Sequence, residues 1–268
     1  MSLDQYFLGH SSAEQRRLQQ QARELATDSS HMFDQLPLLP GARVLEIGCG
    51  PQGCLQMLSD RVGPTGSVVG VEMSEEAVSM AQAFVAEHNL RNVEVRHGDA
   101  KSTGLARGSF DLATARLVLV NVPQPEAIVI EMAALLKSGG FLALHEADWG
   151  LAVCDPPLAA WDRMIRAFQD YSRVNGIDSF IGRRLSRLLR TVGLTDVHFN
   201  PLVHIYDIGH SRRTIFPQFA GNVRERMLAQ GIVPTVEFDK CVDSIRVHLA
   251  DPDTLVIWAY FQAWATKP

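Results

Sequence analysis

The chain has 268 residues, of which 46% are hydrophobic and 21% charged, enough to bury a substantial core in one large domain or a domain with an appendage. Its formal net charge of −5 at pH 7 offers no basic field to a polyanion, so nucleic-acid binding is not expected. The sequence has no apolar run of about 20 residues, no signal-peptide pattern and no CxxC pair, so we expect a reduced, cytoplasmic protein with no membrane partner.

The first half of the chain alternates between helical and strand patterns. Apolar residues at helical spacing predict one or two helices over residues 13–36. Short apolar runs next to glycine or proline turns predict strands over 42–47, 67–71, 93–97, 110–115 and 140–145. Helical patterns fill the gaps, over 53–62, 75–88 and 124–136. Such alternation predicts a parallel sheet with helices on both faces.

The alternation stops after residue 149. Amphipathic helices are predicted over 156–174 and 178–192, then a strand over 196–206, a helical stretch over 212–249 and a final strand over 255–265. Aromatic stripes in this half, such as Trp161 with Phe168 and Phe216 with Phe219, fit a core better than a pocket. The second half therefore adds two strands and a helical insertion that can cover a pocket.

A glycine-rich loop follows the first predicted strand. Segment 44–53 (VLEIGCGPQG) satisfies GxGxxG through Gly48, Gly50 and Gly53, a pattern that nucleotide-binding enzymes of several kinds use. Glu46 argues against a pyrophosphate, because two unit charges about 4 Å apart at an effective dielectric near 20 exchange roughly 4 kcal/mol. The same carboxylate would attract an ammonium or a sulfonium. The alternative is a capping or surface glutamate.

Two further acids follow predicted strands. Glu72 ends the second strand, about 20 residues beyond the loop, where an acid can accept hydrogen bonds from both hydroxyls of a ribose. Asp99 follows the third strand and is placed to accept a hydrogen bond from an adenine amino group; the alternative is a turn aspartate after Gly98. Together these acids indicate a nucleoside ligand.

Five segments occur in an order that is typical of one enzyme family: VLEIGCGPQG, VVGVEMS, RHGDA, FDLATARLVLVNVP and LLKSGGFLALHEADW. Over residues 36–150 the chain resembles class I S-adenosylmethionine-dependent methyltransferases, and is similar to the ubiquinone/menaquinone C-methyltransferase group. The resemblance implies an α/β fold: a seven-stranded, mostly parallel, doubly wound sheet with an antiparallel last strand. N-terminal helices and a helical cap inserted in the C-terminal half complete this expectation.

The resemblance also implies roles for individual residues around S-adenosylmethionine. Glu46, Gly48 and Gly50 surround the methionine part, Glu72 holds the ribose and Asp99 holds the adenine. Met73 packs on the adenine face, and Tyr6 belongs to a segment that resembles a cofactor-covering lid. The full cofactor-binding set expected is Tyr6, Glu46, Gly48, Gly50, Gly53, Glu72, Met73, Asp99, Ala100 and Arg116.

The expected domain organisation follows from this resemblance. Residues 1–35 form an N-terminal helical lid and residues 36–150 form the S-adenosylmethionine-binding core. Residues 151–268 form a helical substrate cap together with the last two strands of the sheet.

Departures from other methyltransferases narrow the chemistry. The fourth strand ends in Ala113-Thr114-Ala115-Arg116, without the (D/N)PPY motif of enzymes that methylate the adenine amino group. The acidic metal ligands of catechol-type enzymes are also missing at Ala115 and Arg116. We therefore expect a metal-independent reaction and no metal-binding residues.

Candidate catalytic residues follow the fifth strand, in the segment His145-Glu146-Ala147-Asp148-Trp149. Successive strand residues face opposite sides, so only one of His145 and Glu146 can point at the methyl group. We expect Glu146 to face the cleft as a base, because burying a carboxylate among helices would require a dedicated partner. His145 is the other candidate and Asp148 the third. The alternatives are acids that cap a helix or pair with an arginine.

The function expected is transfer of a methyl group from S-adenosylmethionine to an O, N or C atom of a small, fairly apolar molecule, including secondary metabolites. A cyclase or other enzyme that keeps the cofactor without methylating is the alternative on the same fold. An NAD(P)-dependent oxidoreductase is less favoured, because the chain has no Tyr-x-x-x-Lys signature. The partner is a small-molecule substrate, and self-association into a homo-oligomer stays open.

Overall fold

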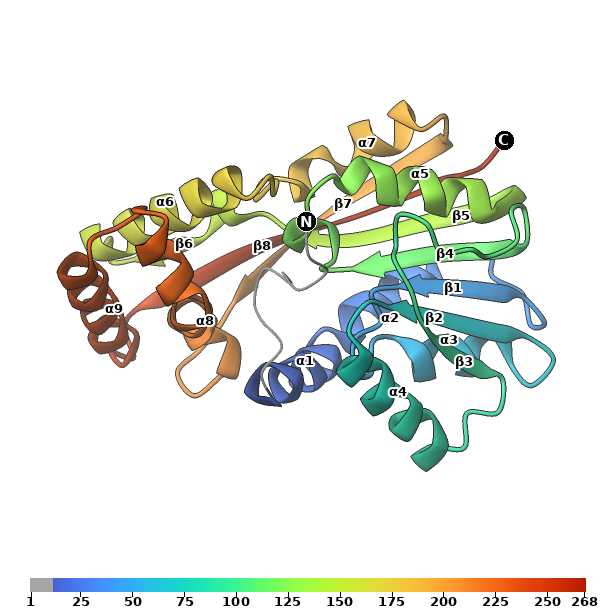
Figure 1. Ribbon diagram of the computed structural model, residues 1–268, viewed down its shortest axis with the longest axis horizontal. Helices are drawn as coiled ribbons and strands as arrows, with labels where there is room; N and C mark the ends of the chain where they lie inside the picture. The colour runs from blue at the N-terminus through green and yellow to red at the C-terminus, as the bar shows by residue number, and fades with distance from the viewer. Residues whose placement is uncertain (1–11) are drawn as a thin grey trace.

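The computed structural model describes residues 12–268, with side chains from Glu14 onward. Figure 1 shows a central sheet with helices on both sides and a further group of helices at one end. Tyr6, which was expected in the cofactor site, lies outside the described residues. The strands are β1 (Arg43–Ile47), β2 (Ser67–Glu72), β3 (Val93–His97), β4 (Phe110–Arg116), β5 (Leu136–Ala147), β6 (Val153–Asp155), β7 (Thr195–Ile205) and β8 (Leu255–Thr266).

These strands form one sheet in the order β3-β2-β1-β4-β5-β8, and both β6 and β7 pair with β8. Strands β1 to β5 are parallel, while β8 is antiparallel to β5, β6 and β7. The predicted α/β fold with a mostly parallel sheet and an antiparallel last strand is confirmed. The sheet has one strand more than the expected seven. The short strand β6 pairs with residues 255–257 of β8, which extend past the end of β5, and so satisfies backbone groups there.

Helices occupy most of the connections, close to where the sequence predicts them. They are α1 (Ser12–Glu24), α2 (Ala26–Asp34), α3 (Leu55–Val62), α4 (Glu75–Glu87), α5 (Pro125–Leu135), α6 (Ala159–Val174), α7 (Leu185–Thr191), α8 (Ile215–Ala229) and α9 (Thr235–Leu249). Short 3-10 turns are η1 (Leu119–Asn121), η2 (Trp149–Leu151), η3 (Gly182–Arg184) and η4 (Ser211–Thr214).

Local sequence explains several helix boundaries. The Ser74 side chain accepts a hydrogen bond from the Ala77 N–H at the start of α4. Pro125, which has no N–H to leave unpaired, opens α5. The single helical stretch expected over 212–249 divides into α8 and α9, because Gly231 adopts a φ of +68° between them and Pro234 precedes α9.

The sheet buries a different hydrophobic cluster on each face. On one face Val44, Leu112 and Ala143 pack with residues of α2, α3 and α4. On the other face Leu45, Ala113 and Leu142 pack with residues of α5 and α7, and this cluster continues into α6, α8 and α9. The alternation of these residues along each strand tells which face any neighbouring residue points to.

Three helices of the second half, α6, α8 and α9, gather beyond the carboxyl ends of β4 and β5, while α7 lies beside α5 (Figure 1). Helix α1 lies against the start of this group, since Asn222 of α8 donates to Glu14 at 3.1 Å and Ser211 donates to Glu24. Between residues 12 and 268, no helix is both long and apolar enough to cross a membrane. The division into lid, core and cap stays a prediction.

Candidate active site

The glycine loop connects β1 to α3 with three glycines in the left-handed region. Gly48, Gly50 and Gly53 have φ values of +65°, +55° and +52°. A Cβ on Gly48 would lie 2.4 Å from the Cγ2 atom of Val118, and a Cβ on Gly53 would lie 2.6 Å from the Oε1 atom of Glu46. Any larger residue at these two positions would collide with a neighbour as well as strain the backbone. The loop is thus fixed tightly at both ends, while nothing lies within 4 Å of the position of a Cβ on Gly50.

Glu46 holds the far end of this loop. Both of its carboxylate oxygens accept the Cys54 N–H, at 2.8 and 3.0 Å, and Cys54 is the residue that precedes α3. The side chain is buried, and burial raises the pKa of Glu46 to about 7, against the opposing effects of Arg116 and of the Cys54 N–H. The capping interaction considered from the sequence is therefore present, at the loop that was expected to hold the methionine part of the cofactor.

Arg116, at the end of β4, contacts the same loop from the other side. Its guanidinium donates to the Ser29 Oγ at 2.9 Å and to the Gly53 carbonyl at 3.3 Å. It thereby connects α2 to the glycine loop. Its expected place beside the cofactor stays a prediction.

Glu72 lies at the end of β2 and contacts the middle of the glycine loop. One oxygen accepts the Gly50 N–H at 3.0 Å, and the other accepts the N–H groups of Met73 and Ser74 at 2.8 and 2.9 Å. Because a carboxylate has about four acceptor sites, capacity is left for a ligand. Glu72 and the glycine loop thus lie side by side, as the sequence predicts.

The end of β3 lies beside Glu72, since Glu72 and His97 are paired across β2 and β3. His97 contacts the Met73 carbonyl at 2.8 Å through Nε2, and the Met73 side chain is 42% exposed. Asp99 accepts the Lys101 N–H at 2.8 Å in a turn, with the half-buried Ala100 between them. The expected adenine residues therefore lie at one edge of the sheet, next to Glu72.

Glu146 does not face a cleft. Its carboxylate is fully buried and accepts three backbone N–H groups, those of Val118 and Leu119 at 3.0 and 2.9 Å and that of Val120 at 3.2 Å. Burial raises the pKa of Glu146 to about 8, although the three N–H donors oppose the shift. The expectation that Glu146 is the cleft-facing residue is wrong, because the β4–α5 connection supplies the dedicated partner that a buried carboxylate requires.

His145 points to the opposite face of the sheet. It pairs with Arg116 on β4 and Gln262 on β8, and its ring meets Tyr260 edge-on with 5.9 Å between centroids. The side chain is fully buried, and within residues 12–268 neither ring nitrogen has a hydrogen-bond partner. Burial, assisted by Arg116, lowers the pKa of His145 to about 3, so the imidazole is neutral at physiological pH.

Asp148, the third candidate base, is paired with an arginine. Its two oxygens accept the Arg183 Nε and Nη2 atoms at 2.6 and 2.7 Å, and the carboxylate is buried. This is the alternative that the sequence left open. Throughout residues 12–268, no group of three or more His, Cys, Asp or Glu side chains is placed to hold a metal ion.

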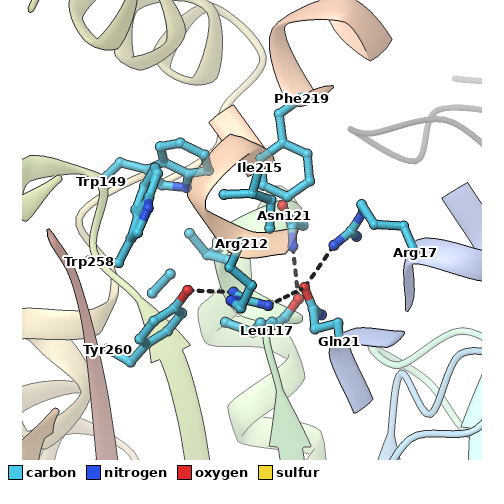
Figure 2. A pocket seen from close by; sticks show the side chains of 12 residues that line it. Arg17, Gln21, Leu117, Asn121, Trp149, Arg212, Ile215, Phe219, Trp258 and Tyr260 are labelled. Carbon is cyan, nitrogen blue, oxygen red and sulfur yellow. Dashed lines mark hydrogen bonds between the residues drawn. The ribbon is translucent and has the colours of Figure 1, made fainter. Parts of the chain in front are cut away.

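Figure 2 shows a pocket between α1, the η4–α8 segment and the carboxyl ends of β4 and β5, with a cavity volume of about 40 Å³. Its apolar lining consists of Leu117, Val120, Ala147, Trp149, Ile215, Phe219 and Trp258. Its polar lining consists of Arg17, Gln21, Asn121, Arg212 and Tyr260. A second, outer hollow of about 350 Å³ shares Arg17, Gln21, Arg212 and Ile215 with it.

One connection separates the pocket from the glycine loop. Val118 packs against Gly48, while its neighbours Leu117 and Val120 line the pocket. The Glu146 carboxylate accepts hydrogen bonds from three backbone N–H groups of this connection. A ligand over the glycine loop and a ligand in the pocket would therefore lie on opposite sides of residues 117–121.

Most of the residues that line the pocket were not predicted from the sequence. Trp258 and Tyr260 are two positions apart on β8 and lie on the same sheet face as His145 and Gln262. Aromatic residues alternating along the last strand were the available signal. Arg212 and Gln21 carry no such pattern, because contacts between distant segments place them.

Comparison with known proteins agrees with this geometry. A family model described as a methyltransferase domain matches residues 38–180, more than half of the chain. An uncharacterized 37.1 kDa protein in transposon TN4556 of Streptomyces fradiae is 32% identical over 82% of this chain and 61% of its own length. Demethylmenaquinone methyltransferase of Listeria monocytogenes is 32% identical over 49% of this chain and 53% of its own length. The chain thus spans between about half and three fifths of the length of these relatives.

Among solved structures, a putative methyltransferase from Bacillus halodurans superposes with a TM-score of 0.62 at 17% identity, over 90% of this chain and 99% of the other. This similarity concerns the fold alone. The family model rests on sequence, and it covers the glycine loop, the acids at the ends of β2 and β3, and the β4–α5 connection. The chain belongs to the family of class I S-adenosylmethionine-dependent methyltransferases.

Proposed function

We propose that the protein transfers a methyl group from S-adenosylmethionine to an O, N or C atom of a small, fairly apolar molecule. The observation that carries this proposal is the contact between Gly48 and Val118. The contact supports the proposal, because a cofactor on the glycine loop and an acceptor in the pocket would then lie on the two sides of residues 117–121. A sulfonium methyl group beside that connection would lie at the border of the pocket.

In this proposal the cofactor lies along the carboxyl ends of β1, β2 and β3. Glu72 accepts the ribose hydroxyls, while Asp99 and Ala100 adjoin the adenine and Met73 packs on its face. Gly48, Gly50 and Gly53 let the backbone approach the methionine part, with Glu46 and Arg116 beside the loop. Support comes from the left-handed glycines and from the pairing of Glu72 with the Gly50 N–H.

The chemistry needs orientation above all, because a sulfonium methyl group is already activated. Holding donor and acceptor in line can supply roughly 7–11 kcal/mol. We propose that Glu146 contributes by positioning residues 118–120 rather than by removing a proton, since its oxygens are occupied by backbone N–H groups. We propose metal-independent transfer, because Ala115 and Arg116 stand where metal-dependent relatives carry acids.

Titration calorimetry tests the proposal directly. We expect S-adenosylmethionine and its demethylated product, S-adenosylhomocysteine, to bind with a Kd in the micromolar range, and NADH to give no measurable heat. Glu46 is the reason, since its carboxylate attracts the cofactor's ammonium and repels a pyrophosphate. Tighter binding of NADH than of S-adenosylmethionine would instead identify an oxidoreductase.

Binding of S-adenosylhomocysteine should also release protons from Glu46. Because burial raises the pKa of Glu46 to about 7, roughly half of the free protein carries this proton at pH 7. A cofactor ammonium favours the ionised form, so binding releases about half a proton per site and affinity increases as the pH rises through 7. Calorimetry in phosphate and in Tris, whose ionisation heats differ, measures this number.

Glu46→Gln is the control for that measurement, and it should remove the proton release. A wild-type protein whose proton release equals that of the variant would mean that Glu46 does not face the ammonium.

A further inference from the structure

Arg212 is a buried cation, and only some of its hydrogen-bond donors are paired with acceptors of the surrounding protein. The residue is 4% exposed, in η4 just before α8. Its Nη2 atom donates to the Tyr260 hydroxyl and its Nη1 atom donates to the Gln21 Oε1 at a long 3.4 Å. Within residues 12–268, its Nε atom has no hydrogen-bond partner. A guanidinium is always charged in proteins, so this charge stays in the pocket at every working pH.

The carboxylate that reaches Arg212 among the described residues is that of Glu24, and it is not in hydrogen-bond contact. Its Oε2 atom lies 3.8 Å from the Arg212 Nη1 atom, and its Oε1 atom accepts the Ser211 hydroxyl. A buried charge without a close counter-ion is destabilising by several kcal/mol unless another partner arrives. The geometry therefore leaves room for an anion at Arg212.

Two neighbouring arginines have a hydrogen-bond partner for each of their side-chain nitrogens. Arg17, which also lines the pocket, contacts both oxygens of Glu14 at 2.6 and 2.8 Å. Arg213, next in the chain, donates to three backbone carbonyls at 2.7, 2.8 and 3.0 Å. Of these three cations, Arg212 alone has a side-chain nitrogen that lacks a hydrogen-bond partner within residues 12–268.

The surface opposite Arg212 is aromatic. Figure 2 shows Arg212 beside Tyr260 and Gln21, with Trp149 and Trp258 across the pocket and Phe219 above. Trp149 meets Trp258 edge-on at 5.1 Å and lies 5.6 Å from Phe219, centroid to centroid. Such walls take a flat apolar group, since ring edges and faces pack well against one another.

Arg212 also lies at the junction of the two hollows, because it lines both the inner cavity and the outer one of about 350 Å³. The outer hollow has room for a ligand whose acidic group meets Arg212, and the inner cavity of about 40 Å³ takes only the tip of its apolar part beside the tryptophans. The connection over residues 117–121, across which the methyl group would arrive, forms the remaining wall.

We propose that the methyl acceptor is a flat, apolar organic acid whose anionic oxygen binds the Arg212 guanidinium. This inference rests on the proposed methyl transfer and deepens it by naming the substrate class. Arg212 determines specificity: an amide or ester of the same shape would leave the buried cation unpaired and would bind more weakly.

The test compares two probes of the same shape, 4-fluorobenzoate and 4-fluorobenzamide, by fluorine NMR on the full chain with and without S-adenosylhomocysteine. We expect the carboxylate to bind about tenfold or more tightly than the amide. Arg212→Met should abolish this preference, and Arg212→Lys should retain part of it, because the charge stays but the two-pronged donor is lost. Arg23→Met, which removes an exposed arginine of α1 outside the pocket lining, should leave the preference intact.

Each outcome decides the proposal. Equal binding of the two probes to the wild-type chain, or a preference that survives in Arg212→Met, would overturn it. If Arg212→Met does not fold, the wild-type comparison and Arg212→Lys still decide, together with the indole N–H signals of Trp149 and Trp258, which the carboxylate should shift. Cofactor calorimetry on the wild-type chain is separate: absent S-adenosylhomocysteine binding would refute methyl transfer, whereas loss of the carboxylate preference alone refutes only the substrate class.

Discussion

Glu72→Ala should weaken the binding of S-adenosylhomocysteine by about 2–4 kcal/mol, since two ribose hydroxyls lose a charged acceptor. In the structure this carboxylate accepts the N–H groups of Gly50, Met73 and Ser74, so the substitution also loosens the middle of the glycine loop. The side chain is only half-buried at a strand end, and folding should survive. Calorimetry measures the change as a loss of roughly 30-fold to 1000-fold in Kd.

Glu75→Ala provides the matched control. Glu75 has the same charge and lies three residues away, but it is exposed in the first turn of α4. Its removal should change the Kd by less than about threefold, because exposed charges at that distance are screened. Wild-type affinity in Glu72→Ala would show that the ribose does not bind at the end of β2.

Glu146→Ala should lower the free energy of unfolding by about 3–6 kcal/mol, because three buried backbone N–H groups lose their acceptor. Glu146→Gln should be much milder, at about 1–3 kcal/mol. Its amide oxygen can still accept from Val118 and Leu119, which share one oxygen of the native carboxylate, and only the Val120 N–H is left facing an NH₂ group. Chemical denaturation measures both values.

The two variants also separate positioning from proton removal. If Glu146 positions residues 118–120, Glu146→Gln keeps its turnover within about tenfold of wild type while Glu146→Ala weakens both cofactor and acceptor binding. A base would behave differently. Glu146→Gln would then be as inactive as Glu146→Ala, with a loss of roughly 10²-fold or more in kcat at unchanged cofactor affinity, and the positioning role would be refuted.

The proximity of the proposed cofactor residues was predictable, because strand ends and glycines are local features. Glu72 and Asp99 each follow an apolar run, and the carboxyl ends of parallel strands share one edge, so pattern alone brings them together. The overall sheet was predictable for the same reason. The short strand β6 was not, since three residues make no periodic pattern and their pairing depends on how far β8 extends past β5.

The pocket proposed to hold the acceptor was harder to predict, because long-range packing decides which residues line it. The predicted orientation of Glu146 was wrong because its partners are backbone N–H groups. Every residue except proline has such a group, so the sequence does not mark which ones will bind a carboxylate. Arg212 and Arg213 look like an exposed basic pair in the sequence, yet both are buried and their roles differ. Only the positions of β8 and α1 tell that one faces a pocket while the other binds carbonyl groups.

The place of β8 in the sheet bears on the order in which a nascent chain can fold. β8 follows β7 by about fifty residues, yet it lies between β5 and β7 and is the partner through which β7 joins the sheet. At a synthesis rate of about 5–20 residues per second, β7 waits roughly 3–10 seconds for that partner to be made. Strands β1 to β5 need no such delay, while Trp258 and Tyr260 arrive only with β8. On the ribosome, the strand ends proposed to hold the nucleoside therefore take shape before the pocket proposed to hold the methyl acceptor.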